Sequence, residues 1–260
     1  MPLTGKYIPG NSLIHKFDVQ GKIIVFIILI FMTIFANSFI GYILLFTVLG
    51  IIIALSKFHL KLIFSSIRHI WKFFIVIFIL NMLFFNGDTI LFQWKFIHLT
   101  KEGLHHGITI ILNVFIILIL GNIFILTTEV TEMMNGLETL LMPLSYFKIP
   151  IEQAVLILTI SFQFIPTLLQ ESNTIRKAQT ARGADFESKY LHKRITAMGA
   201  LFIPVFIAAF KRADDLSIAM EARGFRDAKH RTKKKYSKIS ISGWITIIIF
   251  LLLFIIEIYI

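Results

Sequence analysis

Residues 243–260 read GWITIIIFLLLFIIEIYI, a nearly unbroken apolar run that decides the class of fold. A helix that crosses a bilayer needs about 20 mostly apolar residues, so this run predicts a membrane span. Three further tracts, 23–55, 71–86 and 104–126, have the same character. The first is broken by Asn37-Ser38 and Gly41, which predicts a hairpin of two spans. The sequence therefore predicts an all-α, polytopic membrane protein with about five transmembrane helices.

The composition supports this class and excludes others. The chain is 57% hydrophobic and 16% charged, with 27 Phe and a mean hydropathy of +0.81. Soluble domains carry roughly 25% charged residues, so a disordered chain, a fibrous repeat and an ordinary soluble enzyme are all excluded. The absence of cysteine excludes disulfides, thiolate zinc sites, iron–sulfur clusters and cysteine nucleophiles.

The net charge of +11 is unusual for a membrane protein, and its placement indicates orientation. The 56–72 connection carries four basic residues and no acidic one, whereas the 87–103 connection balances the two signs. Cytoplasmic loops are enriched in Lys and Arg. We therefore expect a cytoplasmic N-terminus and an outside C-terminus. The apolar run from Ile23 is expected to be a retained span rather than a cleaved signal.

The region 128–240 is neither a hydrophilic domain nor a simple set of spans. Residues 151–170 and 197–210 are almost as apolar as spans, and each runs into a charged, helix-compatible stretch. We interpret 1–127 as a membrane domain, 128–240 as a cytoplasmic or interfacial domain of long helices inserted before the last span, and 241–260 as that span. Two additional spans within 128–240 are the competing interpretation.

Two segments of this region resemble each other. FIPTLLQESNTIRKAQTARGADF begins at Phe164, and FIPVFIAAFKRADDLSIAMEARGFRD begins at Phe202. The distance from Pro166 to Arg182 is 16 residues and that from Pro204 to Arg223 is 19. The difference is close to one helical turn, so the two arginines are predicted to leave their helices on similar sides.

The repeated tripeptide Ala-Arg-Gly has two interpretations. Gly just past a helix end, with Arg in the last turn, is how many helices stop. Two such ends also suit docking into two similar acidic or carbonyl-lined pockets, because the guanidinium group binds in a fixed geometry. The candidate docking residues are Ala181, Arg182, Gly183, Ala222, Arg223 and Gly224. The candidate supporting residues are Asp185, Glu221, Pro166 and Pro204.

These motifs carry a family resemblance that covers most of the chain. Residues 12–18, SLIHKFD, are similar to a Ser-x-x-His-x-Leu-Asp element, with Phe17 at the Leu position and Val19-Gln20 where Pro-Arg is commoner. The remaining matches are Thr127-Thr128, Gly136-Leu137-Glu138, Pro143, Ala181–Asp185 and Ala222–Gly224. The chain resembles the transmembrane (T) component of energy-coupling factor (ECF) transporters, the EcfT/CbiQ-like family.

This resemblance implies a non-catalytic coupling subunit of an ATP-driven importer of vitamins or metal ions in a prokaryotic cell membrane. Its implied partners are two cytoplasmic ATPase subunits, which receive the Ala-Arg-Gly helix ends, and a small membrane S component that binds substrate. The sequence contains no G-x-x-x-x-G-K-[ST] phosphate loop. ATP is therefore expected to bind a partner, and we expect no cofactor and no enzymatic activity in this chain.

Other features were weighed against this interpretation. Seven basic residues within 226–238 are expected to contact anionic lipid rather than nucleic acid. His98, His105 and His106 are expected to be solvated rather than to bind a metal. The alternative function is a stand-alone secondary transporter or channel with a cytoplasmic regulatory domain. Such carriers usually keep an ionisable residue in mid-span, and none is found there.

Overall fold

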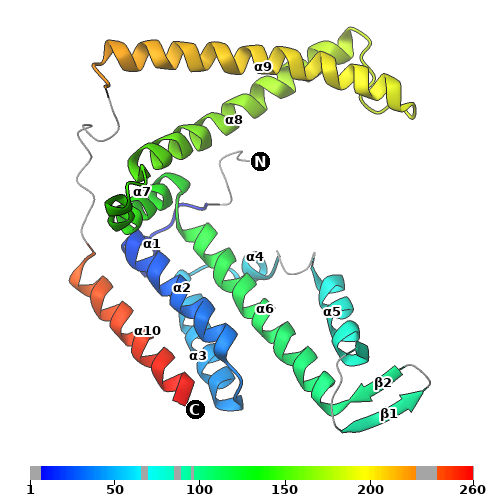
Figure 1. The fold of residues 1–260 in the computed structure, drawn as a ribbon, viewed down its shortest axis with the longest axis vertical. Helices are drawn as coiled ribbons and strands as arrows, with labels where there is room; N and C mark the ends of the chain where they lie inside the picture. Colours follow the sequence, from blue (N-terminus) through cyan, green and yellow to red (C-terminus); the bar gives the residue numbers. More distant parts are fainter. Residues whose placement is uncertain (1–6, 66–69, 85–88, 95–96, 227–238, 260) are drawn as a thin grey trace. The chain divides into compact units, whose positions relative to one another are not determined.

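The structure is a computed structural model that describes residues 7–65, 70–84, 89–94, 97–226 and 239–259. The described chain divides into two compact units, and the boundary falls within one helix, α7 (Val130–Leu141). One unit contains residues 7–136 and 239–259, and the other contains residues 137–226. Figure 1 shows the order of the elements along the chain.

The first unit is a bundle of apolar helices. Its elements are α1 (Leu13–Lys16), α2 (Val19–Phe35), α3 (Phe39–Ser56), α4 (Leu60–Ser65), α5 (Trp71–Phe84), α6 (Lys101–Thr127), the first part of α7, and α10 (Ile241–Tyr259). The two helices predicted from residues 23–55 are confirmed as α2 and α3. Ser38 caps α3, because its Oγ accepts a hydrogen bond from the Gly41 backbone N–H at 3.0 Å. Gly41 was predicted to help break the tract, but it lies inside the first turn of α3.

The core of the bundle lies where α2, α3 and α6 meet. Met32 of α2, Leu45 of α3 and Ile116 of α6 are all at most 1% exposed. The other core residues include Leu29, Ala36, Val48, Leu49, Ile63, Ile119, Leu120 and Ile123. These helices are apolar nearly all round, so packing contacts rather than an amphipathic stripe decide which face of each is inside.

The last helix, α10, packs along α2 although more than 200 residues separate them in sequence. The Asp18 carboxylate accepts a hydrogen bond from the Ser240 backbone N–H at 2.7 Å, and Ser240 Oγ accepts one from Gly243 N–H at 3.1 Å. A carboxylate at a helix N-terminus satisfies a free donor and complements the macrodipole. Gly21 and Gly243 face each other at this contact, where an added Cβ on Gly21 lies 3.8 Å from the Gly243 Cα.

A small β-hairpin departs locally from the all-helical expectation. Strands β1 (Ile90–Trp94) and β2 (Ile97–Thr100) pair antiparallel between α5 and α6. Thr100 then caps α6, because its Oγ1 accepts a hydrogen bond from the Gly103 backbone N–H at 3.1 Å. The hairpin connects two apolar helices and leaves the fold class unchanged.

Five described helices are long and apolar enough to cross a membrane, which confirms the all-α polytopic class. They are α3, α6, α10, α8 (Ile151–Ala181) and α9 (Leu191–Ala222), while α2 and α5 are apolar but shorter. Two of the five, α8 and α9, come from the region that the sequence analysis interpreted as interfacial. Their apolar windows have a lower hydropathy than those of the other three helices.

The second unit is built on α8 and α9, which follow the short 3-10 helix η2 (Met142–Phe147). Within its described residues, α8 buries only Ile151 and Val155, and α9 buries only Ala197. The Arg212 guanidinium Nε contacts the Glu171 carboxylate at 3.0 Å and joins the two helices. This pair of helices therefore has hardly any core of its own.

Candidate functional site

The first candidate docking motif lies at the end of α8 and forms a Schellman cap. Arg182 is the C-cap residue, with φ −86° and ψ 4°. Gly183 follows with φ +93°, and its N–H donates to the Thr180 carbonyl at 3.0 Å. The Ala184 N–H donates to the Gln179 carbonyl at 2.9 Å. These are the two hydrogen bonds that define the motif.

The second motif, at the end of α9, repeats this geometry. Arg223 is the C-cap residue, with φ −85° and ψ 6°, and Gly224 follows with φ +76°. The Gly224 N–H donates to the Glu221 carbonyl at 2.8 Å, and the Phe225 N–H donates to the Met220 carbonyl at 3.0 Å. The two helix ends are therefore nearly identical in backbone conformation.

The backbone conformation of the two caps, and not a lack of space for a side chain, explains why Gly183 and Gly224 are glycines. An added Cβ at Gly183 or Gly224 meets no heavy atom within 4 Å, but both have a positive φ that side-chain-bearing residues rarely adopt. The capping interpretation of the tripeptide is thus confirmed for its glycine. It leaves the arginine unexplained, because Arg182 and Arg223 are both exposed.

The ion pair between α8 and α9 lies at matching positions relative to the two arginines. Glu171 precedes Arg182 by eleven positions, and Arg212 precedes Arg223 by eleven positions. At 1.5 Å per residue, each arginine lies about 16 Å along its helix from the contact. The two arginines of the second unit therefore lie at equal distances along their helices from the Glu171–Arg212 contact.

The surroundings of the two ends differ. After α8, the chain folds back on the helix, where the Arg176 guanidinium lies 5.4 Å from the Phe186 ring centroid and 3.8 Å from the Glu187 carboxylate. Asp185 contributes to this turn, since its Oδ1 accepts a hydrogen bond from Glu187 N–H at 3.1 Å. After the Arg223-Gly224 cap of α9, only Phe225 and Arg226 are described before the undescribed residues 227–238.

The remaining predicted supporting residues lie within the two helices or their caps. Pro166 and Pro204 are inside α8 and α9, which continue past them. Glu221 contributes its backbone carbonyl to the second cap, while its side chain is exposed. The structure thus places every predicted residue of the two motifs on α8, on α9 or directly after them.

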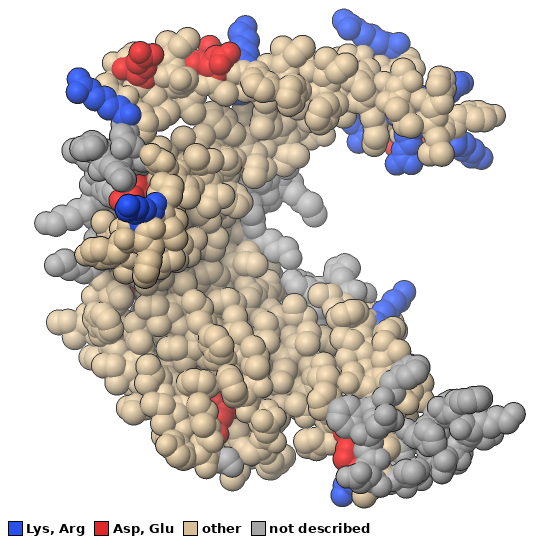
Figure 2. Space-filling view, in the orientation of Figure 1, with Lys and Arg blue, Asp and Glu red and all other residues tan. Residues whose placement is uncertain are grey.

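Upstream of its cap, α9 carries an exposed aromatic row. Phe202 and Phe206 stack with ring centroids 5.8 Å apart, and Phe206 contacts Phe210 edge-on at 4.7 Å. All three side chains are more than half exposed. On the face in Figure 2, charged side chains gather over α9, while the surface over α2 and α10 carries very few. The α9 helix thus combines an apolar face with charged ends.

The N-terminal motif, residues 12–18, has a structural role. Its His15 and Asp18 side chains are three positions apart but have different partners. His15 Nδ1 lies 2.6 Å from Ser12 Oγ and its Nε2 lies 3.1 Å from the Ile8 carbonyl oxygen, whereas Asp18 binds the start of α10. A carboxylate that caps a helix distant in sequence leaves no local pattern, so this contact could not be predicted from the sequence.

Two buried ionisable side chains were also missed, one near each end of the bundle. Lys22 of α2 is 6% exposed and Glu257 of α10 is 5% exposed. Both lie near helix ends, whereas the sequence prediction concerned ionisable residues in mid-span. Both oxygens of Glu257 are buried without a hydrogen-bond partner in the described structure.

The histidine and basic candidates add no site to the described structure. His106 Nδ1 lies 3.3 Å from the Asn81 side-chain oxygen, and the side chain of His98 lies outside the described residues. Where residues are described, no group of three His, Cys, Asp or Glu side chains is placed to hold a metal ion. Most of the basic segment 226–238 also lies outside the described residues.

The apolar helices together define the class: this is a multi-pass helical membrane protein. A family model described as CbiQ, cobalt transport protein, matches residues 10–234. The chain therefore belongs to the EcfT/CbiQ family of transmembrane T components of ECF transporters, as its motifs predicted.

Curated relatives agree with this assignment. The chain is 37% identical to the energy-coupling factor transporter transmembrane protein EcfT of Ruminiclostridium cellulolyticum, over 89% of this chain and 86% of the relative. It is 36% identical to EcfT of Acidaminococcus fermentans, over 96% and 94% of the two chains, and 35% identical to EcfT of Bacillus subtilis, over 93% and 90%. Each of these relatives is named as a transmembrane part of a transporter, a name that implies further components.

Proposed function

We propose that this chain couples two cytoplasmic ATPase subunits to a substrate-binding S component, with Arg182 and Arg223 each docking one ATPase. The observation that carries the proposal is the matched geometry of the two helix ends. Their caps share the same backbone conformation and lie at equal distances from the Glu171–Arg212 contact. Two similar ATPase subunits require two similar contacts, and the α8–α9 pair offers them.

The chemistry of the caps suits this role. In each Schellman cap, backbone carbonyls in the last turn accept hydrogen bonds from N–H groups of the residues that follow the helix. The arginine side chain is therefore not needed to satisfy these carbonyls. For both arginines, the described structure records no side-chain hydrogen bond or ion pair. The guanidinium group is a planar fork of donors, so it loses less conformational entropy per hydrogen bond than a lysine does when it enters an acidic or carbonyl-lined pocket.

In this proposal, movement of the ATPases is transmitted through α8 and α9 as levers. A continuous helix transmits a displacement of its end, and the ion pair between Glu171 and Arg212 joins the two levers. The exposed row of Phe202, Phe206 and Phe210 provides an apolar surface for the S component, which selects the vitamin or metal ion. ATP binding and hydrolysis take place in the partners, and this chain contributes no catalytic residue.

The proposed orientation places the N-terminus in the cytoplasm and the C-terminus outside. It rests on the basic 56–72 connection and the balanced 87–103 connection. The α8 and α9 caps are then on the cytoplasmic side, where ATPases are found. Cysteine labelling of Lys16→Cys and Tyr259→Cys with a membrane-impermeant maleimide tests this orientation, because only the second is expected to react from outside.

The docking proposal is tested by co-expression of the tagged chain with its ATPase and S-component partners. Arg182→Glu/Arg223→Glu is expected to lose both ATPases on purification and to abolish ATP-driven uptake. Leaving one partner of a docked charge pair unmatched costs about 2–5 kcal/mol, which weakens binding by more than about tenfold. With separate tags on the ATPases, each single variant is expected to weaken retention of one of them more than the other.

The matched control is Arg194→Glu, which makes the same charge change at an exposed site in the first turn of α9. It is expected to retain both ATPases and near-normal uptake. If the double variant still co-purifies with both ATPases and supports uptake, the docking assignment is wrong. If Arg194→Glu is as damaging as the double variant, the effect is a general one of charge and the assignment is also wrong.

A further inference from the structure

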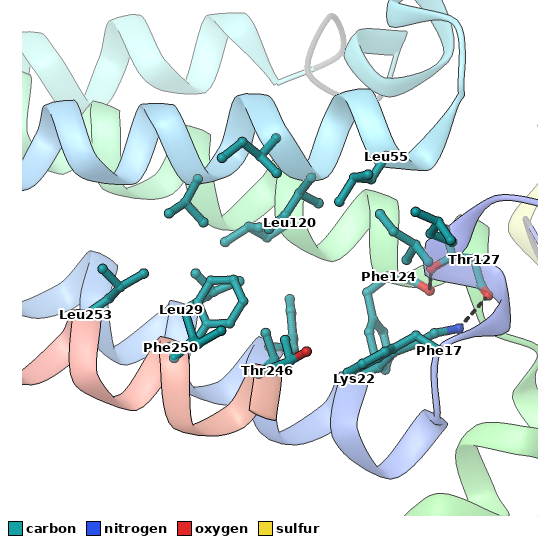
Figure 3. A pocket seen from close by; sticks show the side chains of 18 residues that line it. Phe17, Lys22, Leu29, Leu55, Leu120, Phe124, Thr127, Thr246, Phe250 and Leu253 are labelled. Atoms are coloured by element: carbon teal, nitrogen blue, oxygen red, sulfur yellow. Dashed lines mark hydrogen bonds between the residues drawn. The ribbon is translucent and has the colours of Figure 1, made fainter. Parts of the chain in front are cut away.

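An apolar cavity of about 380 Å³ lies inside the helical bundle. Its walls come from α2, α3, α6 and α10, with α1 at one end, and all of them belong to the first unit. Figure 3 shows the lining, in which Leu29, Leu120, Phe124, Phe250 and Leu253 are labelled. The volume is within the range of small-molecule binding sites.

The cavity is wedge-shaped, because α3 and α10 are close at one end and diverge toward the other (Figure 1). At the narrow end, an added Cβ on Gly41 of α3 lies 3.2 Å from the Glu257 carboxylate of α10. Toward the other end, Leu55 of α3 and Thr246 of α10 line the cavity. Ile51 of α3 and Ile249 of α10 line it as well and are about half exposed, so the cavity opens to the surface between these two helices.

The wide end of the wedge contains a buried cation. Lys22 lines the cavity, and its Nζ donates to the Thr127 carbonyl at 3.1 Å (Figure 3). The same Nζ donates to the His15 carbonyl at 3.5 Å. An ammonium group has three donors, so one remains available for an anion. Glu132 of α7 acts electrostatically on Lys22, but it does not line the cavity, and no ion pair to Lys22 is recorded in the described chain.

Lys22 lies at one end of the helical bundle, and we place a membrane surface at this level because the ends of apolar helices gather there. It lies in the first turn of α2, and its partner Thr127 is the last residue of α6. The nearby cavity residues Leu55 and Thr246 are at the end of α3 and the start of α10. Four helix ends therefore meet at one level, where lipid headgroups lie. Basic pockets between helices at this level bind anionic headgroups.

From this arrangement we propose that the wedge between α3 and α10 binds an anionic phospholipid, with one acyl chain in the cavity and its phosphate at Lys22. The opening lies on apolar helix faces, the lining is apolar, and the cation is at the headgroup end. The ligand is thus recognised by two features at once: an apolar chain and a negative charge at one end of it.

The charge and width of the cavity argue against a helix of a partner protein as the occupant. The lining runs from Val48 to Leu55 on α3, a rise of about 10 Å, and includes Lys22 at one end. A helix is about 10 Å wide with its side chains, whereas an acyl chain is much narrower. A lipid also carries its negative charge at one end of an apolar chain, which matches the position of Lys22.

The test uses the full chain, assembled with its partner subunits, in phosphatidylcholine vesicles with trace photoreactive lipid. The probes are phosphatidylglycerol and phosphatidylcholine that carry a diazirine on one acyl chain, and labelled peptides are identified by mass spectrometry. The proposal expects phosphatidylglycerol to label residues 48–55 and 246–253 more strongly than phosphatidylcholine does. Lys22→Gln is expected to reduce this preference at least about fivefold, while Lys22→Arg retains it.

Two matched controls separate the cavity from the general lipid-facing surface. Ile249→Trp narrows the opening, whereas Ile248→Trp adds the same side chain at an exposed neighbour that does not line the cavity. Labelling of the cavity lining is expected to fall in Ile249→Trp but not in Ile248→Trp. Lys16→Gln removes an exposed charge on α1 and is expected to leave the preference unchanged.

Three results overturn the proposal. The first is equal labelling by the two lipids in the unmodified protein, and the second is an anionic preference that persists in Lys22→Gln. The third is labelling of the lining in the isolated chain but not in the assembled complex, which means that a partner subunit covers the opening. If Lys22→Gln fails to fold, the comparison of labelling in Ile249→Trp and Ile248→Trp still tests whether the lipid enters the cavity.

Discussion

The two units of this chain contrast in how they use apolar residues. In the bundle, Met32, Leu45 and Ile116 are enclosed by neighbouring helices. In the α8–α9 unit, Phe202, Phe206 and Phe210 are equally apolar, but they contact mainly one another and remain exposed. The apolar windows of α8 and α9 have a lower hydropathy than those of α3, α6 and α10, yet all five helices are apolar enough to cross a membrane. Hydropathy therefore does not show which apolar side chains build a core and which stay exposed.

This difference indicates where each unit gets its stability. The bundle is held by side-chain packing between helices, which is the main attraction available inside a membrane. The α8–α9 pair has a single described ion pair between its helices, two capped ends and hardly any buried side chains. We therefore expect substitutions in the bundle to change stability and those in the pair to change assembly.

The largest effect is expected for Met32→Ala in the bundle. Met32 is 0% exposed, and replacing a buried Met by Ala leaves a cavity that costs about 2–5 kcal/mol. Thermal unfolding of the purified protein in detergent should show a clearly lower midpoint. The control is Phe206→Ala in α9, which removes a larger but exposed side chain and is expected to shift stability by less than about 0.5 kcal/mol. Equal losses in both variants contradict the contrast between the units.

The next effect is expected for Gly183→Ala at the first cap. Gly183 has φ +93°, and an alanine in the left-handed region costs about 1–2 kcal/mol. Hydrogen exchange should become faster at the last turn of α8, and ATPase retention should fall while the bundle stays unchanged. Gly199→Ala within α9, where an added Cβ meets nothing within 4 Å, should instead stabilise the helix by about 0.5–1 kcal/mol. Unchanged exchange in the last turn of α8 argues against the strained-cap interpretation.

A moderate effect is expected for Asp18→Ala, which removes the carboxylate that accepts the Ser240 N–H. Loss of a side-chain cap costs about 1 kcal/mol, so the midpoint of thermal unfolding should fall and exchange should increase at the start of α10. Asp18→Asn keeps an oxygen acceptor and is expected to retain most of the stability. If Asn is as damaging as Ala, the charge and not the hydrogen bond is what matters.

The smallest stability effect is expected for Glu171→Gln, which weakens the ion pair with Arg212. Both side chains are partly exposed, so the loss should be about 0.2–1 kcal/mol and hard to detect in thermal unfolding. Uptake coupled to ATP hydrolysis should nevertheless fall, because the two levers lose their connection. The exchanged pair Glu171→Arg/Arg212→Glu should restore part of that uptake. If uptake is not restored, the ion pair does not take part in coupling.

Much of the bundle was predictable because its signals are local. The break at Asn37-Ser38 separates α2 from α3, since Ser38 caps the second helix through a residue three positions away. The same holds for the Ala-Arg-Gly caps, in which every hydrogen bond joins residues within five positions. The hairpin of β1 and β2 was missed, because its short strands lie between two long apolar helices whose pattern dominates the sequence.

The contacts that were not predictable join residues far apart in the chain. Asp18 binds Ser240, Lys22 binds the Thr127 carbonyl, and Glu171 pairs with Arg212. Nothing in the spacing of these residues marks them as partners. The wedge-shaped cavity could not be predicted either, because most of its lining comes from four helices, α2, α3, α6 and α10, that are apolar nearly all round.

The membrane class, the family and most of the helices and their ends could be predicted from the sequence alone, because hydropathy, caps and motifs act over a few residues. Which apolar side chains are enclosed and which are exposed was visible only in the packed structure. The structure also showed that the two arginine ends extend equally from one contact and that Lys22 lies at the wide end of a cavity. The physical reason is that burial and pairing depend on which helices meet, and uniformly apolar helices do not encode that choice in their local pattern.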